Sequence, residues 1–119
     1  LDVFFVTLNK ADKDYSPTTM YNDYSISESL FHWQSQSTTA ENSPTGQRYI
    51  HHKERGSKVL LFVREFKADR VTGGAEAYTY LGTASYVKHE GSRPMNITWR
   101  LDRPIPAKFL KKTNKLVVG

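Results

Sequence analysis

Apolar and polar residues alternate with the two-residue period of a β-strand in residues 95–102 (MNITWRLD). The apolar set is Ile97, Trp99 and Leu101, and the polar set is Asn96, Thr98 and Arg100. Because successive side chains of a strand point to opposite faces, the two sets lie on opposite sides. This segment is therefore predicted to be a strand with one face against a core.

Four further segments are predicted to be strands: residues 1–8, 29–36, 58–67 and 77–89. Residues 58–67 (KVLLFVREFK) are apolar on both faces at their start, which predicts a central strand. Gly82 interrupts the last of the four and predicts a β-bulge or a barrel bend there.

Helices are predicted to be few and short. Residues 18–24 are expected to hold a helical turn, residues 47–55 a helix that ends at Gly56, and residues 107–112 a second, basic helix. Polar connections are expected at residues 9–17, 37–46 and 69–74. The sum predicts a mainly β (α+β) fold, built as a strongly bent antiparallel sheet or a small β-barrel with two or three short helices.

Length and composition limit the possible classes of protein. The 119 residues fit one domain spanning residues 1–119, and the absence of cysteine excludes disulfides, thiolate catalysis and Cys-ligated zinc. Residues 1–8 have no basic leader or cleavage site, and no apolar run is long enough to cross a bilayer. We expect a cytoplasmic protein without a membrane partner. A start in mid-strand without methionine suggests a piece excised from a longer protein.

The charge balance favours a polyanionic partner. There are 17 basic and 12 acidic residues, which gives a net charge of +5 and a pI near 9.5. Such a charge attracts nucleic acid, although ordinary solubility charge explains the same value equally well.

Catalytic and metal-binding motifs are missing from the sequence. His51, His52 and Glu54 lie close together, but no second cluster has ligand-like spacing, so no metal and no cofactor are predicted. No Gly-x-Ser-x-Gly elbow and no phosphate-cradling glycine motif occurs. The carboxylate pair Asp12 and Asp14 lies in a polar loop, which is a poor place to tune a pKa. We therefore expect a non-catalytic domain.

Residues 24–36 (YSISESLFHWQSQ) combine aromatic rings with amide groups. A nucleobase in a pocket is held by stacking on a ring and by hydrogen bonds to its edge, which these side chains supply. The candidate contacts are Tyr24, His32, Trp33, Gln34, Ser35 and Gln36. Strand alternation places Phe31 and Trp33 partly in the core and the row of His32, Gln34 and Gln36 toward a groove. The alternative is a core aromatic strand with a solvated polar face.

A second candidate set is basic: Arg48, Tyr49, Lys53 and Arg55 are predicted to form a phosphate-contacting edge, or else an ordinary solvated helix face. The lysines of residues 108–115 are weaker candidates, because cations near the end of a helix also complement its dipole.

Four blocks of sequence carry a family resemblance: DYSISESLFHWQSQS, SPTGQRYIHHKERG, VLLFVRE and YLGTASYVKHEGSRPMNITWRLDRPIP. Along nearly its whole length the chain resembles the uncharacterised domain at the C-terminal end of bacterial superfamily-two helicases. Those helicases often carry a phospholipase-D-like nuclease domain in front. The resemblance implies a restriction or phage-defence machine, in which this domain works beside helicase and nuclease domains of the same chain.

A looser, fold-level resemblance connects the strand content and residues 81–84 (LGTA) with PUA-like domains. That group includes the SRA, EVE and ASCH domains, several of which flip out a modified base, but the analogy transfers no contact residue. Three functions stay open. The first is DNA binding with recognition of a modified or flipped base. The second is docking on the helicase or another protein, and the third is sensing of a nucleotide or nucleobase.

Overall fold

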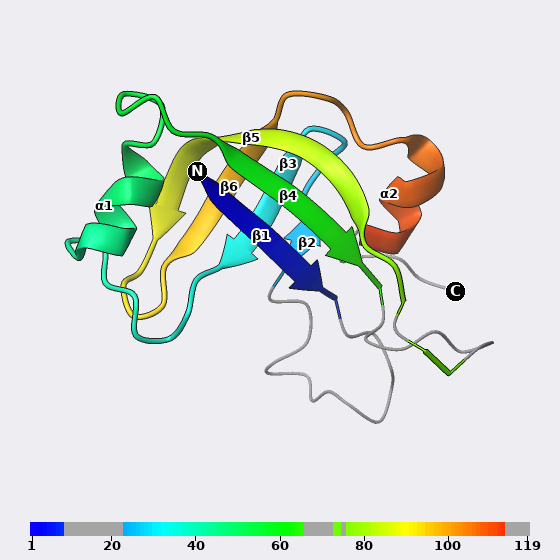
Figure 1. Ribbon diagram of the computed structural model, residues 1–119, viewed down its shortest axis with the longest axis horizontal. Helices are drawn as coiled ribbons and strands as arrows, with labels where there is room; N and C mark the ends of the chain where they lie inside the picture. The colour runs from blue at the N-terminus through cyan, green and yellow to red at the C-terminus, as the bar shows by residue number, and fades with distance from the viewer. Residues whose placement is uncertain (9–22, 66–72, 75, 114–119) are drawn as a thin grey trace.

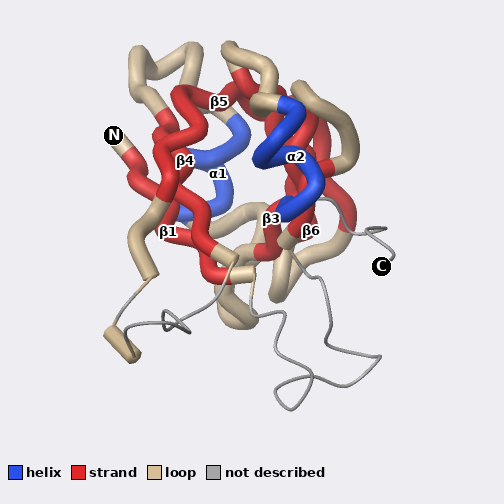
Figure 2. The backbone as a smooth tube through the Cα atoms, turned by 90° about the vertical axis from the view of Figure 1, so that its right-hand side faces the viewer, coloured by secondary structure: helices blue, strands red, loops and turns tan. Residues whose placement is uncertain are grey.

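The structure is a computed structural model that describes residues 1–8, 23–65, 73–74 and 76–113. Six strands form one sheet in the order β1-β4-β5-β6-β3-β2. Their bounds are β1 Asp2–Thr7, β2 Tyr24–Ser25, β3 Leu30–Gln34, β4 Val59–Arg64, β5 Thr79–Glu90 and β6 Asn96–Leu101. The sheet curls around a single core (Figure 2). This confirms the mainly β prediction of a bent sheet with few helices.

One strand pair corrects the antiparallel prediction. β1 pairs with β4 in parallel, while the other neighbouring pairs are antiparallel. Between β1 and β4 the chain forms β2, β3 and a helix, so no tight hairpin turn imposes an antiparallel arrangement on this pair. The sheet is therefore mixed at its β1 edge.

Two helices lie at opposite ends of the curled sheet, α1 (Pro44–Ile50) at one end and α2 (Ala107–Thr113) at the other (Figure 1). The predicted bounds of the first helix, 47–55, are wrong at both ends. Ser43 caps α1, because its Oγ accepts a hydrogen bond from the Gly46 N–H at 3.0 Å, and Pro44 suits the first turn. After α1 the chain continues in turns to Gly56, whose φ is +67°.

The predicted helical turn at 18–24 is contradicted at Tyr24, which belongs to β2 and pairs with His32 of β3. Residues 18–22 lie outside the described residues, as does the predicted loop at 9–17. The predicted bulge at Gly82 is confirmed. Leu61 pairs with Gly82 and Phe62 with Tyr80, so one residue of β5 is extra at that point.

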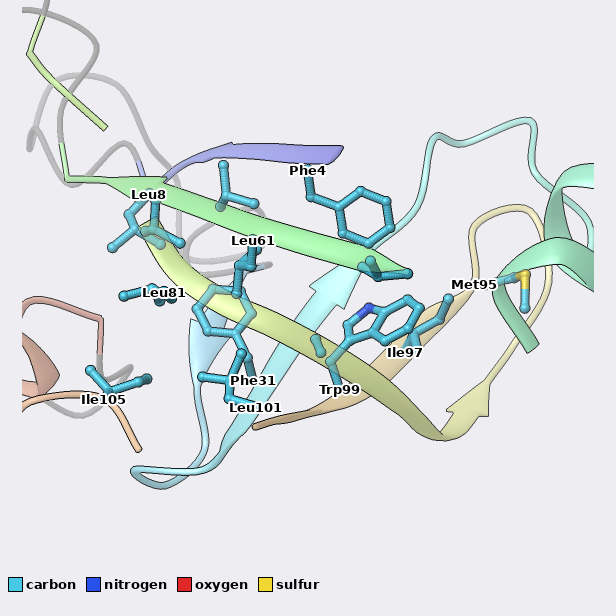
Figure 3. Close-up of a cluster of buried hydrophobic side chains, with 14 residues drawn as sticks. Phe4, Leu8, Phe31, Leu61, Leu81, Met95, Ile97, Trp99, Leu101 and Ile105 are labelled. Carbon is cyan, nitrogen blue, oxygen red and sulfur yellow. The ribbon is translucent and has the colours of Figure 1, made fainter. Parts of the chain in front are cut away.

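The core fills the inner face of the curled sheet (Figure 3). The alternation predicted for residues 95–102 is confirmed, because Ile97, Trp99 and Leu101 are all buried there. Phe31 is also fully buried, and Trp33 packs against the same cluster. Within the parts of the chain that the structure describes, no helix is long and apolar enough to span a membrane.

Candidate nucleic-acid interface

The outer face of the sheet, which points away from the core, gathers polar side chains from three neighbouring strands. In an antiparallel pair, directly opposite residues point to the same face. The central strand β6 presents Asn96, Thr98 and Arg100 there. On the β3 side these residues face Gln34, His32 and Leu30, and on the β5 side they face Glu90, Lys88 and Ser85. Strand pairing thus builds one continuous outer surface across β5, β6 and β3.

A groove of about 330 Å³ opens on this surface, within the range of roughly 300–1,000 Å³ that holds small ligands. Its lining residues are Tyr24, Ile26, Leu30, His32, Lys88, His89, Glu90, Asn96 and Thr98. Tyr24 and His32 stack with ring centroids 4.7 Å apart and planes 15° from parallel. Beside them the Gln34 Nε2 donates to the Asn96 Oδ1 at 3.2 Å. Aromatic faces and amide groups therefore meet at one place.

Two cations on this face form no ion pair with a described residue. Lys88 and Arg100 are exposed, and neither forms an ion pair with any residue that the structure describes. Glu90 is the one carboxylate among the groove-lining residues, and it is also exposed. Unpaired, hydrated ammonium and guanidinium groups can approach a phosphate without first breaking an internal ion pair.

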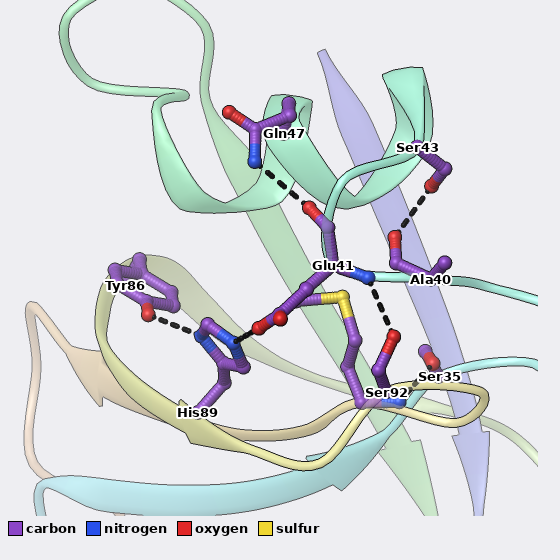
Figure 4. A network of polar contacts seen from close by, with 9 residues as sticks. Ser35, Ala40, Glu41, Ser43, Gln47, Tyr86, His89 and Ser92 are labelled. Atoms are coloured by element: carbon purple, nitrogen blue, oxygen red, sulfur yellow. Dashed lines mark hydrogen bonds and ion pairs between the residues drawn. The ribbon is translucent and has the colours of Figure 1, made fainter.

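A hydrogen-bonded chain holds one side of the groove in place (Figure 4). The His89 Nε2 lies 2.7 Å from the Glu41 carboxylate, and the His89 Nδ1 lies 2.6 Å from the Tyr86 hydroxyl. Because a carboxylate only accepts, the Nε2–H donates to Glu41, and in the neutral imidazole Nδ1 then accepts from the Tyr86 hydroxyl. Burial and the Glu41 charge raise the pKa of Tyr86 above its ordinary value, which keeps its hydroxyl proton available to donate. Ser92 accepts from the Glu41 backbone N–H at 3.0 Å and fastens the same loop to the β5–β6 hairpin.

This chain depends on a second irregularity in β5. Tyr86 pairs with Trp99 and Lys88 pairs with Thr98, so Val87 is an extra residue on β5. The bulge places Lys88 on the outer face while Tyr86, three residues before His89, packs against the core.

Asp23 supports the end of β3 next to the groove. Its Oδ1 accepts a hydrogen bond from the backbone N–H of Gln34, the last residue of β3, at 2.8 Å. Burial raises the pKa of Asp23 to about 6, and the hydrogen bond from Gln34 lowers it by a smaller amount. A carboxyl group that ionises near pH 6 therefore fixes the position of the Gln34 backbone.

The structure separates the residues predicted for base recognition into two groups. Tyr24, His32 and Gln34 lie on the outer face, which agrees with the side predicted for His32 and Gln34. Trp33 lies on the inner face, where its ring stacks on Phe4. Ser35 is buried, and its Oγ accepts the Met95 N–H at 2.8 Å. Gln36 is exposed beyond the end of β3.

The predicted phosphate-contacting edge does not form one surface. Tyr49 packs against the core and makes an edge contact with Trp33 at 5.4 Å. Arg48 forms a two-point ion pair with Asp2, and these hydrogen bonds raise the pKa of Arg48. Lys53 and Arg55 lie beyond α1, in the turns that follow it, and both are exposed. Of this set, Lys53 and Arg55 are the two cations that are exposed and form no ion pair with a described residue.

Four residues of the outer face were absent from the predicted site: Lys88, Asn96, Thr98 and Arg100. The alternation of residues 95–102 did place three of them on a polar face, but it could not show that this face adjoins His32. No three His, Asp or Glu side chains in the described ranges lie close enough together to hold a metal ion.

The family described as "Domain of unknown function (DUF3427)" matches residues 2–112. Comparison with the curated proteins gives no match.

Proposed function

The chain belongs to the family described as a domain of unknown function (DUF3427), and we propose that it is a non-catalytic DNA-binding module that reads a modified or flipped base. The observation that carries this proposal is the groove on the outer face of the sheet. The Tyr24–His32 stack, the Asn96 amide and the exposed Lys88 line it, and Gln34 and Arg100 lie beside it on the same face.

Each part of the groove has a separate task in this proposal. The Tyr24–His32 stack offers an aromatic face on which a base can lie. The Asn96 and Gln34 amides supply both donors and acceptors for the edge of a base. A base held in this way has left the helical stack, because the edge and the face of a paired base are not accessible together.

The cations supply the affinity that does not depend on sequence. Lys88 lines the groove, and Arg100 stands one row away on the same face. Contacts from such groups to phosphate position the strand and release counterions. The net charge of +5 draws DNA toward the domain, and Glu90 at the groove disfavours a phosphate in that one position.

We place the domain in a larger cytoplasmic machine of restriction or phage defence. This rests on the sequence resemblance to the C-terminal domains of helicases that carry a nuclease domain. In such a machine the helicase and nuclease domains of the same chain do the chemistry, and this domain selects the DNA.

Binding of fluorescent DNA to the isolated domain tests the proposal. Plain, methylated, hydroxymethylated and glucosylated oligonucleotides, single-stranded and duplex, are titrated and followed by anisotropy at several salt concentrations. We expect preference for one modified DNA and an affinity that falls steeply with salt. Asn96→Ala should lower the affinity for the preferred DNA about tenfold and reduce the preference for it, because the change removes a contact to the edge of the base worth about 1–3 kcal/mol.

Arg55→Ala is the matched control, because it removes one exposed positive charge from a turn outside the groove. Lys88→Ala should weaken all DNAs more than Arg55→Ala does. A wild-type domain that binds free nucleotides as tightly as DNA indicates a small-ligand sensor instead. No salt-dependent DNA binding would refute the proposal.

A second candidate function, docking on the rest of the parent protein, is favoured by an exposed aromatic patch. Phe5 is 60% exposed on β1, and its ring stacks on Phe62 at 5.1 Å. Tyr80 on β5 is 48% exposed, and its ring centroid lies 4.8 Å from that of Phe62. Because β4 lies between β1 and β5, Tyr80 extends the patch on the side of Phe62 away from Phe5. Exposed apolar patches are typical of interaction sites. Phe5→Ser should weaken association with the parent protein's other domains while DNA binding by the isolated domain is unchanged.

A further inference from the structure

A second pocket, of about 240 Å³, lies where the turn after α1 meets β4 and β5. Its lining residues are His52, Lys53, Ser57, Lys58, Val59, Thr83, Ala84, Ser85 and Asp102. Lys53 and Lys58 are exposed, and in the described part of the chain neither has an ion-pair partner. Two ammonium groups that line one pocket repel each other. An anion bound between them is attracted by both, and this attraction offsets the repulsion.

Hydroxyl groups complete the lining. The Ser85 side chain has no hydrogen-bond partner among the residues with described positions, so its hydroxyl is available to a ligand. The lining also holds one carboxylate, Asp102, which accepts the Thr83 hydroxyl and keeps its negative charge, so the two lysines outnumber it. Two lysines and a free hydroxyl group around a pocket of this size suit a phosphate group, which accepts several hydrogen bonds and carries negative charge.

The buried side chain of His52, which is 2% exposed, supports the pocket. Its Nε2 accepts the Tyr86 backbone N–H at 3.1 Å, and its Nδ1 lies 3.0 Å from the Ser57 carbonyl oxygen. Both ring nitrogens are thus engaged, so His52 is a positioning residue. It ties the turn that carries Lys53 and Ser57 to the middle of β5, and so holds the backbone of this turn beside Ser85.

Strand register connects the pocket with the groove. Ser85 of the pocket lies opposite Arg100, and Arg100 lies opposite Leu30 of the groove. Ser85 and Leu30 are therefore two strand spacings apart, about 10 Å, and Arg100, which forms no ion pair with a described residue, lies between them. This is a path over which a nucleic-acid backbone can run.

We infer that the pocket of Lys53, Lys58 and Ser85 binds a backbone phosphate of the DNA strand whose base enters the groove. The inference rests on the proposed function and adds a direction to it. The strand runs from the groove across Arg100 to the turn after α1. Lys53 then contacts phosphate as the sequence suggested, with Lys58 and Ser85 as its partners in place of Arg48 and Tyr49.

The first test uses the double variant Lys53→Ala/Lys58→Ala and DNA binding at a series of salt concentrations. Loss of one phosphate contact should reduce the slope of log affinity against log salt by about 0.9 for duplex DNA or about 0.7 for a single strand. Arg55→Ala/Lys108→Ala is the control, because it removes the same charge from exposed positions that line neither site. The control should keep the wild-type slope.

The second test titrates inorganic phosphate, with chloride at equal ionic strength as reference, and follows the backbone amide signals by NMR. Shifts at Ser57 and Ser85 that are lost in the lysine double variant support the pocket. Equal slopes for the double variant and the control overturn the inference, and if Asn96→Ala still weakens DNA the proposed function survives. A wild-type domain that binds phosphate in the pocket but no DNA overturns both.

Discussion

The indole of Trp33 lies flat against the ring of Phe4, with centroids 4.1 Å apart and planes 8° from parallel. The two residues come from β3 and β1, which are not hydrogen-bonded neighbours in the sheet. Tyr49 of α1 meets both rings edge-on, at 5.5 Å from Phe4 and 5.4 Å from Trp33. Aromatic stacking thus joins strands near opposite edges of the curled sheet and makes Trp33 a structural residue.

We therefore expect Trp33→Ala to lower the free energy of unfolding by about 3 kcal/mol, since it removes a large ring packed against the core. Chemical denaturation measures this loss. DNA affinity at a temperature where the variant is folded should stay within about twofold of the wild type. His32→Ala, on the outer face of the same strand, is the control with the opposite expectation. A stable Trp33→Ala variant that has lost DNA binding would contradict this assignment.

His52 is expected to matter for stability far more than its neighbour His51. The change His52→Ala leaves the Tyr86 N–H and the Ser57 carbonyl oxygen without their side-chain partner and opens a cavity. We expect a loss of about 3 kcal/mol, against less than about 0.5 kcal/mol for His51→Ala. The His51 side chain is 36% exposed, and its Nδ1 lies 3.3 Å from the exposed carboxylate of Glu54. Thermal unfolding of the two variants provides the comparison, and equal melting temperatures would count against the assignment.

Asp23 should make the stability of the domain depend on pH. Its pKa of about 6 in the folded protein exceeds the value of 3.8 for a free side chain, so the folded state binds more protons between these values. Stability from this group is therefore greatest below about pH 4 and falls as the pH rises to about 6. Asp23→Asn keeps an oxygen acceptor for the Gln34 N–H and removes the cost of burying the charge.

The variant should accordingly be more stable than the wild type by roughly 1–2 kcal/mol at pH 7.5 and about equal to it at pH 3.5. Urea denaturation of both proteins at the two pH values measures the difference. Glu28→Gln removes a charge from an exposed side chain and should give no such crossover. A destabilised Asp23→Asn variant at pH 7.5 would show that the ionised carboxylate is needed for the hydrogen bond.

Gly46 is expected to reject the smallest side chain. In most helices, replacing glycine with alanine stabilises by about 1 kcal/mol. Here Gly46 is buried in α1, and a Cβ would collide with the carbonyl oxygen of Ala40, which is backbone and cannot rotate away. We expect Gly46→Ala to destabilise by about 2 kcal/mol. Thr45→Ala, one residue earlier in the helix, should change the melting temperature little, and a gain in stability at Gly46 would contradict the packing described.

The strands that alternate or carry long apolar runs were predictable because local sequence decides their pattern. β6 is the clearest case, and its buried and polar faces are those that the alternation assigned. The start of α1 was missed because the predicted loop was rich in serine and proline. The same Ser43-Pro44 pair is also a helix N-terminus, and the capping hydrogen bond to Gly46 decides between the two.

The candidate site was predictable only in part. Alternation assigned His32, Gln34 and Gln36 to a row toward a groove and Trp33 partly to the core. In the structure His32 lines the groove, Gln34 lies beside it on the outer face, Gln36 is exposed beyond β3, and Trp33 packs against the core. Their partners on β5 and β6 could not be found in this way, because register between strands distant in sequence is set by the packing of the whole core. The two extra residues of β5 illustrate this point, since Lys88 reaches the outer face through the bulge at Val87.

The sequence by itself determined the β-rich class, the buried faces of the strands and the basic charge, because residue type and spacing act locally along the chain. Tertiary structure alone decided which of the aromatic and basic residues are accessible. It packed Tyr49 against the core, paired Arg48 with Asp2 and left Lys53, Lys58, Lys88 and Arg100 exposed. The physical reason is that accessibility depends on what packs against each side chain, and those contacts come from strands and helices far apart in sequence.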